Sequence, residues 1–157
     1  MEAYRSSLML CLLIFVAAAA VVDLRTRRIP NLLTISAAIA GLLLNLSRGG
    51  GSGVMASGAG LLTGLAVFLP FYLAGGFGAG DVKAMAAVGT FLGAKGALVA
   101  ATWTLLVGGL GALGVLAALR WQAARGQRHW RVSDAVRQRF PYGLAIACGT
   151  ALSLAWN

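Results

Sequence analysis

Apolar runs that are long enough to enter a lipid bilayer fill most of this chain, and they constrain its fold more than any other feature. A helix that crosses a hydrocarbon core about 30 Å thick needs about 20 mainly apolar residues. The chain has 157 residues, of which 59% are hydrophobic and 11% are charged, whereas soluble domains contain about 45–50% apolar and about 25% charged residues. The sequence therefore predicts an all-α, polytopic membrane protein with a single membrane-embedded domain over residues 1–157.

The apolar runs predict a bundle of about six transmembrane helices. The runs are Ser7–Val22, Asn31–Leu46, Gly53–Leu73, Val82–Leu92, Ala97–Leu119 and Pro141–Trp156. The fourth run has about a dozen residues, a length that also fits a re-entrant or interfacial segment. The first run also has the pattern of a secretory signal peptide, but the arginines that follow it predict that its end faces the cytoplasm.

Positive charge predicts the orientation of this bundle, because short loops rich in Lys and Arg stay in the cytoplasm. With six spans and the N-terminus outside, the positive residues on the outer side are Arg5, Arg48 and Lys95. Those on the cytoplasmic side are Arg25, Arg27, Arg28, Lys83, Arg120, Arg125, Arg128, Arg131, Arg137 and Arg139. This distribution supports the fourth run as a span, and it accounts for the net charge of +9 without a nucleic-acid partner.

The basic loop Arg120–Arg139 combines arginines with tryptophans, a composition that suits anionic lipid headgroups at the membrane surface. A solvated loop without a specific partner is an equal alternative. His129 is the only histidine, and Cys11 and Cys148 lack the CxxC spacing of a metal or redox site. The sequence thus predicts no metal and no cofactor, and it predicts that both cysteines are small core residues.

Asp23 and Asp81 are two of only four acidic residues, and each stands at the end of an apolar run. An ionisable side chain at bilayer depth costs about 2.5–3.5 kcal/mol on insertion scales, so it is a candidate functional residue. Taken singly, Asp81 fits a helix-start residue and Asp23 fits a partner of the nearby arginines. The predicted topology places both at cytoplasmic helix ends, where a compact bundle can unite them.

Two carboxylates in one site cannot both ionise cheaply, so such a pair supplies a general base and a general acid at one pH. The ionised member takes a proton from a water that attacks a peptide carbonyl, and the protonated member polarises the carbonyl oxygen and helps the amine to leave. This is aspartyl proteolysis. The glycine-rich segment Gly75–Gly80 before Asp81 predicts a loop with positive φ that lets backbone approach a bound peptide. Elsewhere, the spacings Gly60/Gly64 and Gly89/Gly93 predict close helix packing.

Three separated blocks resemble the prepilin peptidases, which are membrane aspartyl proteases of the GxGD type. The blocks are Asp23-Leu24-Arg25-Thr26-Arg27-Arg28-Ile29-Pro30-Asn31, Gly78-Ala79-Gly80-Asp81-Val82-Lys83 and Pro141-Tyr142-Gly143. The resemblance implies that Asp23 and Asp81 are the catalytic pair. It also implies residues that support this pair, which are Gly78, Gly80, Lys83, Pro30 and Asn31. It further implies a possible substrate pocket formed by Pro141, Tyr142 and Gly143.

By the same resemblance, the chain is a multi-pass protein of the bacterial inner membrane that removes a short basic leader from type IV prepilins at the cytoplasmic face. Larger relatives carry a cytoplasmic CxxC domain between the first two helices and methylate the new N-terminus. Only Leu24–Ile29 separate those two helices here, so we expect no methyltransferase activity. The chain is similar to the compact peptidases of tight-adherence (Flp) pilus systems.

A transporter is the main alternative, because carboxylates beside glycine-broken membrane helices also mark ion- or proton-coupled transport sites. A transporter of this kind predicts paired broken segments near the bilayer midplane, whereas the two aspartate blocks are dissimilar and lie at one predicted face. A non-catalytic scaffold of pilus assembly is a third alternative, and it would tolerate the loss of either carboxylate. The sequence leaves open which aspartate carries the proton, which prepilin is cleaved and what the oligomeric state is.

Overall fold

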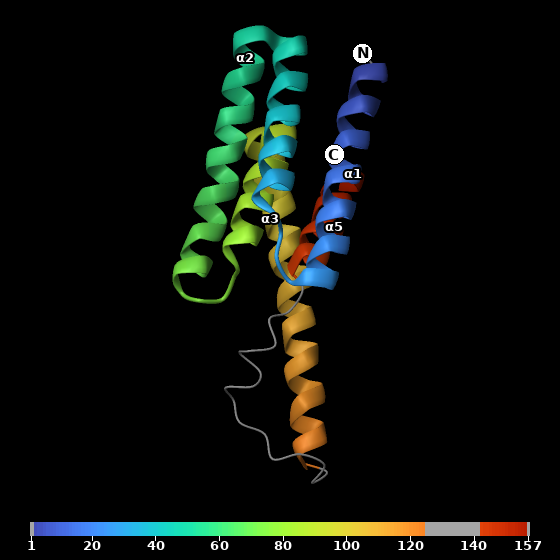
Figure 1. The fold of residues 1–157 in the computed structure, drawn as a ribbon, viewed down its shortest axis with the longest axis vertical. Helices are drawn as coiled ribbons and strands as arrows, with labels where there is room; N and C mark the ends of the chain where they lie inside the picture. The colour runs from blue at the N-terminus through green and yellow to red at the C-terminus, as the bar shows by residue number, and fades with distance from the viewer. Residues whose placement is uncertain (1, 125–141, 157) are drawn as a thin grey trace.

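The computed structural model describes residues 2–124 and 142–156, and the regular elements in these ranges are all α-helices. They are α1 (Glu2–Thr26), α2 (Asn31–Leu73), α3 (Ala79–Ala124) and α5 (Tyr142–Trp156). Figure 1 shows them packed side by side in an elongated bundle. The predicted all-α class is therefore confirmed for the described part of the chain.

Helices α2 and α3 each break at one glycine. Gly50 has φ 53° and ψ −130°, and Gly93 has φ 69° and ψ 179°. Side chains of L residues rarely tolerate positive φ, so glycine permits both breaks. At each break the chain folds back, so that α2 and α3 each consist of two arms (Figure 1). Both glycines fall in gaps between the apolar runs that the sequence predicts as separate helices.

Three of the described helices are long and apolar enough to cross a membrane. They are Ser6–Thr26 within α1, Asn31–Leu73, and Ala79–Ala118 within α3, while the apolar part of α5 is shorter. Large apolar side chains also cover outward-facing surfaces, as in the stripe of α2 that comprises Leu32, Ile35, Ile39, Leu43 and Leu46. Such surfaces are expected where lipid surrounds the helices. The count of six spans and the outside position of the N-terminus remain predictions.

The second arm of α2 and the first arm of α3 approach so closely that their backbones touch. A Cβ atom on Gly60 would collide with the Gly89 carbonyl oxygen, and one on Gly89 would collide with the Gly60 carbonyl oxygen. Gly64 likewise lies against the backbone of Met85. Close packing is thus confirmed at these three glycines, because only a residue without Cβ allows this approach. The fourth, Gly93, forms the chain reversal, and its carbonyl carbon also lies against Gly60.

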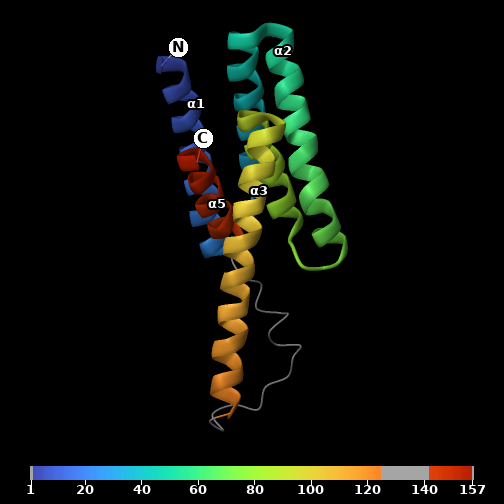
Figure 2. The ribbon, with the colours of Figure 1, turned by 180° about the vertical axis from the view of Figure 1, so that it is seen from behind.

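Helix α5 packs against α1 and against the second arm of α3 (Figure 2). A Cβ atom on Gly149 would collide with Thr104 of α3, and Ile146 is fully buried. Helix α1 contacts α5 much more extensively than it contacts α3. Consequently, α5 is the main connection between α1 and the long hairpin of α3.

The predicted core position of the two cysteines is wrong. Cys11 and Cys148 are both exposed on the helix surfaces. A thiol is a small, weakly polar group, so it tolerates a surface that faces hydrocarbon as well as a protein interior. An apolar neighbourhood in a sequence that is apolar throughout therefore does not indicate which face of a helix a cysteine occupies.

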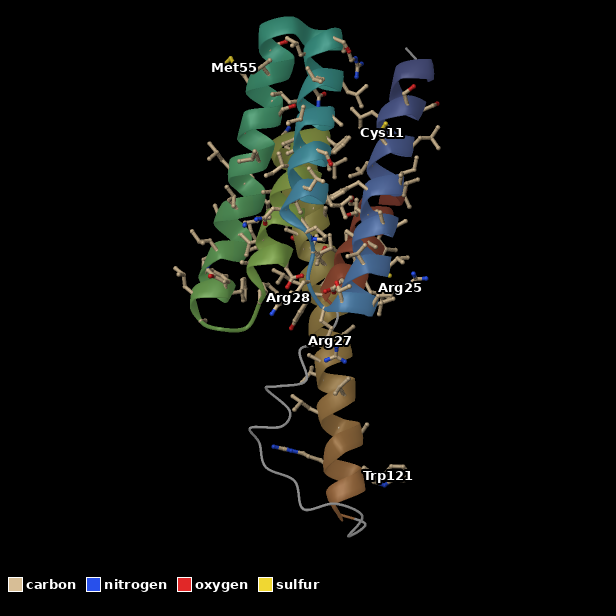
Figure 3. All side chains as sticks on the ribbon, viewed as in Figure 1. Cys11, Arg25, Arg27, Arg28, Met55 and Trp121 are labelled. Carbon is tan, nitrogen blue, oxygen red and sulfur yellow. The ribbon has the colours of Figure 1, made fainter. Side chains whose placement is uncertain are left out.

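The second arm of α3 continues beyond the rest of the bundle (Figures 1 and 2). Its exposed large side chains in this extension include Leu110, Leu113, Leu116 and Trp121. Trp121, labelled in Figure 3, lies far along the extension. The predicted basic loop begins here at Arg120, but its part from residue 125 onward, with His129, lies outside the described residues.

Candidate active site

The three sequence blocks meet at one end of the bundle, which we call the site end. Helix α1 ends there, and α2, α3 and α5 begin there (Figure 1). Arg25, Arg27 and Arg28 mark this end of α1 in Figure 3. Residues that are far apart in the sequence are therefore brought together by the antiparallel course of the helices.

Asp23 lies in the last turn of α1 and is 7% exposed. Its Oδ2 accepts a hydrogen bond of 2.9 Å from the backbone N–H of Gly143, the second residue of α5. The first N–H groups of a helix have no partner within the helix, and the helix dipole favours negative charge beside them. The start of α5 is thus chemically suited to hold the Asp23 carboxylate.

A tight turn ends α1 just after Asp23. Arg27 has φ 52°, and its N–H donates to the Asp23 carbonyl oxygen at 2.8 Å. Pro30 then precedes α2 with φ −62° and ψ 140°, and its carbonyl oxygen accepts from the Leu33 N–H at 3.1 Å. Pro30 is thus the N-cap of α2, which begins at the next residue.

Glycines shape the segment before Asp81. Gly75 has φ 79°, its N–H donates to the Tyr72 carbonyl oxygen at 2.9 Å, and the Gly76 N–H donates to the Phe71 carbonyl oxygen at 2.9 Å. This pair of bonds is a Schellman motif, which satisfies the last carbonyls of α2 and requires the left-handed conformation that glycine adopts readily. The prediction of positive φ in this glycine-rich loop is therefore confirmed at Gly75.

Asp81 is the third residue of α3 and is 8% exposed. Its Oδ2 accepts a hydrogen bond of 2.9 Å from the Gly78 N–H, while the Gly78 carbonyl oxygen accepts from the Asp81 N–H at 3.1 Å. This is the carboxylate half of a capping box. Both aspartates therefore accept a backbone N–H, Asp23 at the start of α5 and Asp81 at the start of its own helix.

Contacts between the first two blocks hold the two helix starts together. A Cβ atom on Gly80 would lie 3.2 Å from Cβ of Ile29 and 3.4 Å from its backbone nitrogen. Three residues later, the Lys83 ammonium donates a hydrogen bond of 2.9 Å to Oδ1 of Asn31. Gly80, Lys83 and Asn31 are thus placed at the junction of α2 and α3.

Aromatic rings connect the third block to the second. Phe77 stacks on Phe68 with ring centroids 5.0 Å apart, and Tyr142 meets Phe77 edge-on at 4.4 Å. The Tyr142 phenol also lies within electrostatic reach of the Asp81 carboxylate. Tyr142 therefore contacts the Asp81 segment through its side chain, while its neighbour Gly143 binds Asp23 through its backbone.

The structure brings together nine of the ten residues that the sequence nominates for the site or its support, and Pro141 lies outside the described residues. Sequence reasoning gave Ile29 only as part of the first block and did not nominate Phe77 for the site. A large ring within a run of glycines was a signal for Phe77, because such a segment has few other side chains with which to anchor itself. The described residues contain no group of three His, Cys, Asp or Glu that could hold a metal ion.

A family model described as the type IV leader peptidase family matches residues 10–113. The chain belongs to this family. The match includes both aspartate blocks and stops before Tyr142 and Gly143. No curated protein and no solved structure matches the chain.

Membership of this family implies a protease of the aspartic type that processes prepilin substrates. The apolar helices agree with the membrane location expected of such an enzyme. The family match covers the first two blocks, and the spatial contacts add the third block at the same end of the bundle.

Proposed function

We propose that the chain is a membrane-embedded aspartic endopeptidase that removes the short basic leader of type IV, Flp-like prepilins. The observation that carries this proposal is the pair of buried carboxylates at the site end. Asp23 and Asp81 come from different helices, and the Tyr142–Gly143 dipeptide contacts the surroundings of both. Two carboxylates joined in this way suit general acid–base chemistry on a peptide bond.

In the proposed reaction, the ionised carboxylate accepts a proton from water as the water oxygen attacks the carbonyl carbon of the scissile bond. The protonated carboxyl of the partner donates to the carbonyl oxygen, which gives a neutral tetrahedral intermediate. As the C–N bond breaks, the carboxyl that took a proton from water donates it to the departing amine, and the other carboxylate accepts a hydroxyl proton of the intermediate, which restores the pair. The two aspartates act as a unit, so the protonation states belong to the pair.

We further propose six membrane passes with the N-terminus outside and the site end in the cytoplasm. The arms of α2 on either side of Gly50 would each span about 28–34 Å at 1.5 Å per residue, close to a bilayer core of about 30 Å. The first arm of α3 and helix α5 would span only about 21–23 Å, and a bilayer thins locally around short helices. Arg25, Arg27 and Arg28 at the site end favour its cytoplasmic location.

This orientation fits the proposed substrate. A prepilin presents a basic leader in the cytoplasm and an apolar helix in the membrane, so its scissile bond lies at the boundary where the carboxylates would stand. The location proposed is the bacterial inner membrane, with anionic lipid headgroups as partners of the basic residues at this face.

The test is a gel-mobility assay of a co-expressed Flp-type prepilin with wild type, Asp23→Asn and Asp81→Asn. We expect each variant to lower cleavage by about 10²–10⁴-fold, because each removes a group that transfers protons in the transition state. Glu2→Gln is the matched control, since it removes a carboxylate from the opposite end of α1. Cleavage at the wild-type rate by either aspartate variant, at equal membrane expression, would refute the mechanism.

A further inference from the structure

We propose that the first turn of α5 sets the relative position of the two carboxylates, with Gly143 and Tyr142 as positioning residues. This inference rests on the proposed function. Neither residue needs to touch the substrate. Gly143 would act through Asp23, and Tyr142 would act through the loop that holds Asp81.

Gly143 acts through both its backbone and its lack of a side chain. Its N–H donates to Oδ2 of Asp23 at 2.9 Å, so the carboxylate is held directly against the helix start. A Cβ atom at this position would lie 2.7 Å from Cβ of Asp23 and 2.9 Å from Oδ2. Carbon atoms in good contact are about 3.5–4.0 Å apart. Any side chain here must therefore push Asp23, including the base of its side chain, away from α5.

Tyr142 is fixed on two sides. Its ring meets Phe77 edge-on with a centroid distance of 4.4 Å, and a Cβ atom on Gly108 of α3 would lie 3.0 Å from its Cε1. Phe77 directly precedes Gly78, whose N–H binds Oδ2 of Asp81. The Tyr142 ring thus supports the loop that orients the second carboxylate.

Helix α5 is well placed to control this geometry. Helix α1, which carries Asp23, contacts α5 much more than it contacts α3, which carries Asp81. A shift of the first turn of α5 therefore changes the separation of the two carboxylates, because α1 has only small direct interfaces with α2 and α3. In catalysis, a misplacement of about 1 Å can lower the rate by about 10²-fold.

The main test measures prepilin cleavage by purified Gly143→Ala in detergent, with Gly109→Ala as the matched control. Gly109 is a helical glycine on α3 at which an added Cβ meets open space. We expect Gly143→Ala to lower kcat by about 10²-fold with KM within about 3-fold of wild type, and Gly109→Ala to match wild type. Cleavage by Gly143→Ala at half the wild-type kcat or more would overturn the proposal.

A second pair keeps the proposal testable if Gly143→Ala does not accumulate in the membrane. Tyr142→Phe keeps the ring on Phe77, whereas Tyr142→Ala removes it. We expect Tyr142→Phe to stay within about 3-fold of wild-type kcat and Tyr142→Ala to fall by about 10²-fold at similar KM. Loss of activity in Tyr142→Phe would overturn the positioning role, because it would assign the chemistry to the phenol itself. Full activity of Tyr142→Ala would overturn it as well.

The two proposals fail in distinguishable ways. If Asp23→Asn or Asp81→Asn retains cleavage, the proposed function is wrong, and the positioning role falls with it. If both aspartate variants are inactive while Gly143→Ala and Tyr142→Ala cleave normally, the dyad stands, and only the role of α5 is refuted.

Discussion

Two polar clusters in this apolar bundle satisfy opposite kinds of backbone group. At the site end, backbone N–H groups at helix starts donate to the carboxylates of Asp23 and Asp81. At the Gly93 reversal, side chains donate to backbone carbonyls instead. The Thr90 carbonyl oxygen accepts 2.8 Å hydrogen bonds from both Nδ2 of Asn45 and Oγ of Ser57.

The difference follows from the direction of the helix. A helix start exposes N–H groups and the positive end of the dipole, whereas a helix end exposes carbonyls and the negative end. The first arm of α3 ends at Gly93, so neutral donors such as Asn45 and Ser57 suit its last carbonyls. Carboxylates are suited only to the opposite end. The same helix arm thus separates an ionisable site from a neutral, structural cluster.

Among the substitutions that test the difference between the two clusters, Asn45→Asp is expected to have the largest effect. The substitution keeps the shape but replaces a donor with a charge that faces the carbonyls of Thr90 and Phe91. A negative charge at the carbonyl end of a helix costs up to about 2 kcal/mol in a partly buried site, in addition to the lost hydrogen bonds. We expect a marked loss of thermal stability in detergent, measured by unfolding of the purified protein.

Asn45→Ala is the matched control for that experiment. It removes the donors without adding charge, and Ser57 still donates to Thr90. Interhelical hydrogen bonds in membranes average about 0.6 kcal/mol with a maximum near 1.7, so Asn45→Ala should destabilise less than Asn45→Asp. Equal melting temperatures for the two variants would contradict the claim that the carbonyl end of this helix arm disfavours a carboxylate.

Gly93→Ala tests whether the reversal is architectural. With φ 69° and ψ 179°, Gly93 occupies a region that is nearly exclusive to glycine, where other residues cost about 1–3 kcal/mol. We expect lower thermal stability but a normal cleavage rate per folded molecule. Gly58→Ala is the control, because an added Cβ there meets open space. A selective loss of cleavage at unchanged stability would show that the reversal is coupled to the site.

Lys83→Gln tests whether the link between α2 and α3 at the site end matters for cleavage, and it should have the smallest effect. It weakens the 2.9 Å bond to Asn31 that links the starts of α2 and α3, and this bond is exposed. A typical hydrogen bond contributes about 0.5–1.5 kcal/mol, so we expect kcat/KM to fall by about 2–10-fold. Lys95→Gln should leave cleavage unchanged. A loss comparable to that of Asp81→Asn would indicate that Lys83 takes part in the chemistry.

The sequence was sufficient to predict the helical class, the positions of both chain reversals and the blocks that meet at the site end. Apolar runs separated at residues 47–52 and 93–96 indicated where α2 and α3 would break, and Gly50 and Gly93 lie in those gaps. The aspartate blocks were recognisable because charged residues are so few in this chain. The alternating directions of the predicted helices placed both aspartate blocks at the same end of the bundle.

Contacts of single side chains were not predictable in this way. Cys11 and Cys148 were expected in the core and are exposed, because a uniformly apolar helix gives no signal for which face packs inward. Phe77 was passed over, although its ring joins Phe68 to Tyr142. The partners of Thr90 were not foreseen either, since Asn45 and Ser57 lie far from it in the sequence.

By itself, the sequence determined that the chain forms apolar helices, where glycine allows those helices to reverse, and which scarce carboxylates are candidates for a site. These properties are local, because hydrophobicity, backbone freedom and charge belong to individual residues. Only the tertiary structure decided that Gly143 holds Asp23 and that Gly78 holds Asp81. Hydrogen bonds and steric contacts act over a few ångströms, so they depend on how distant helix ends meet in space.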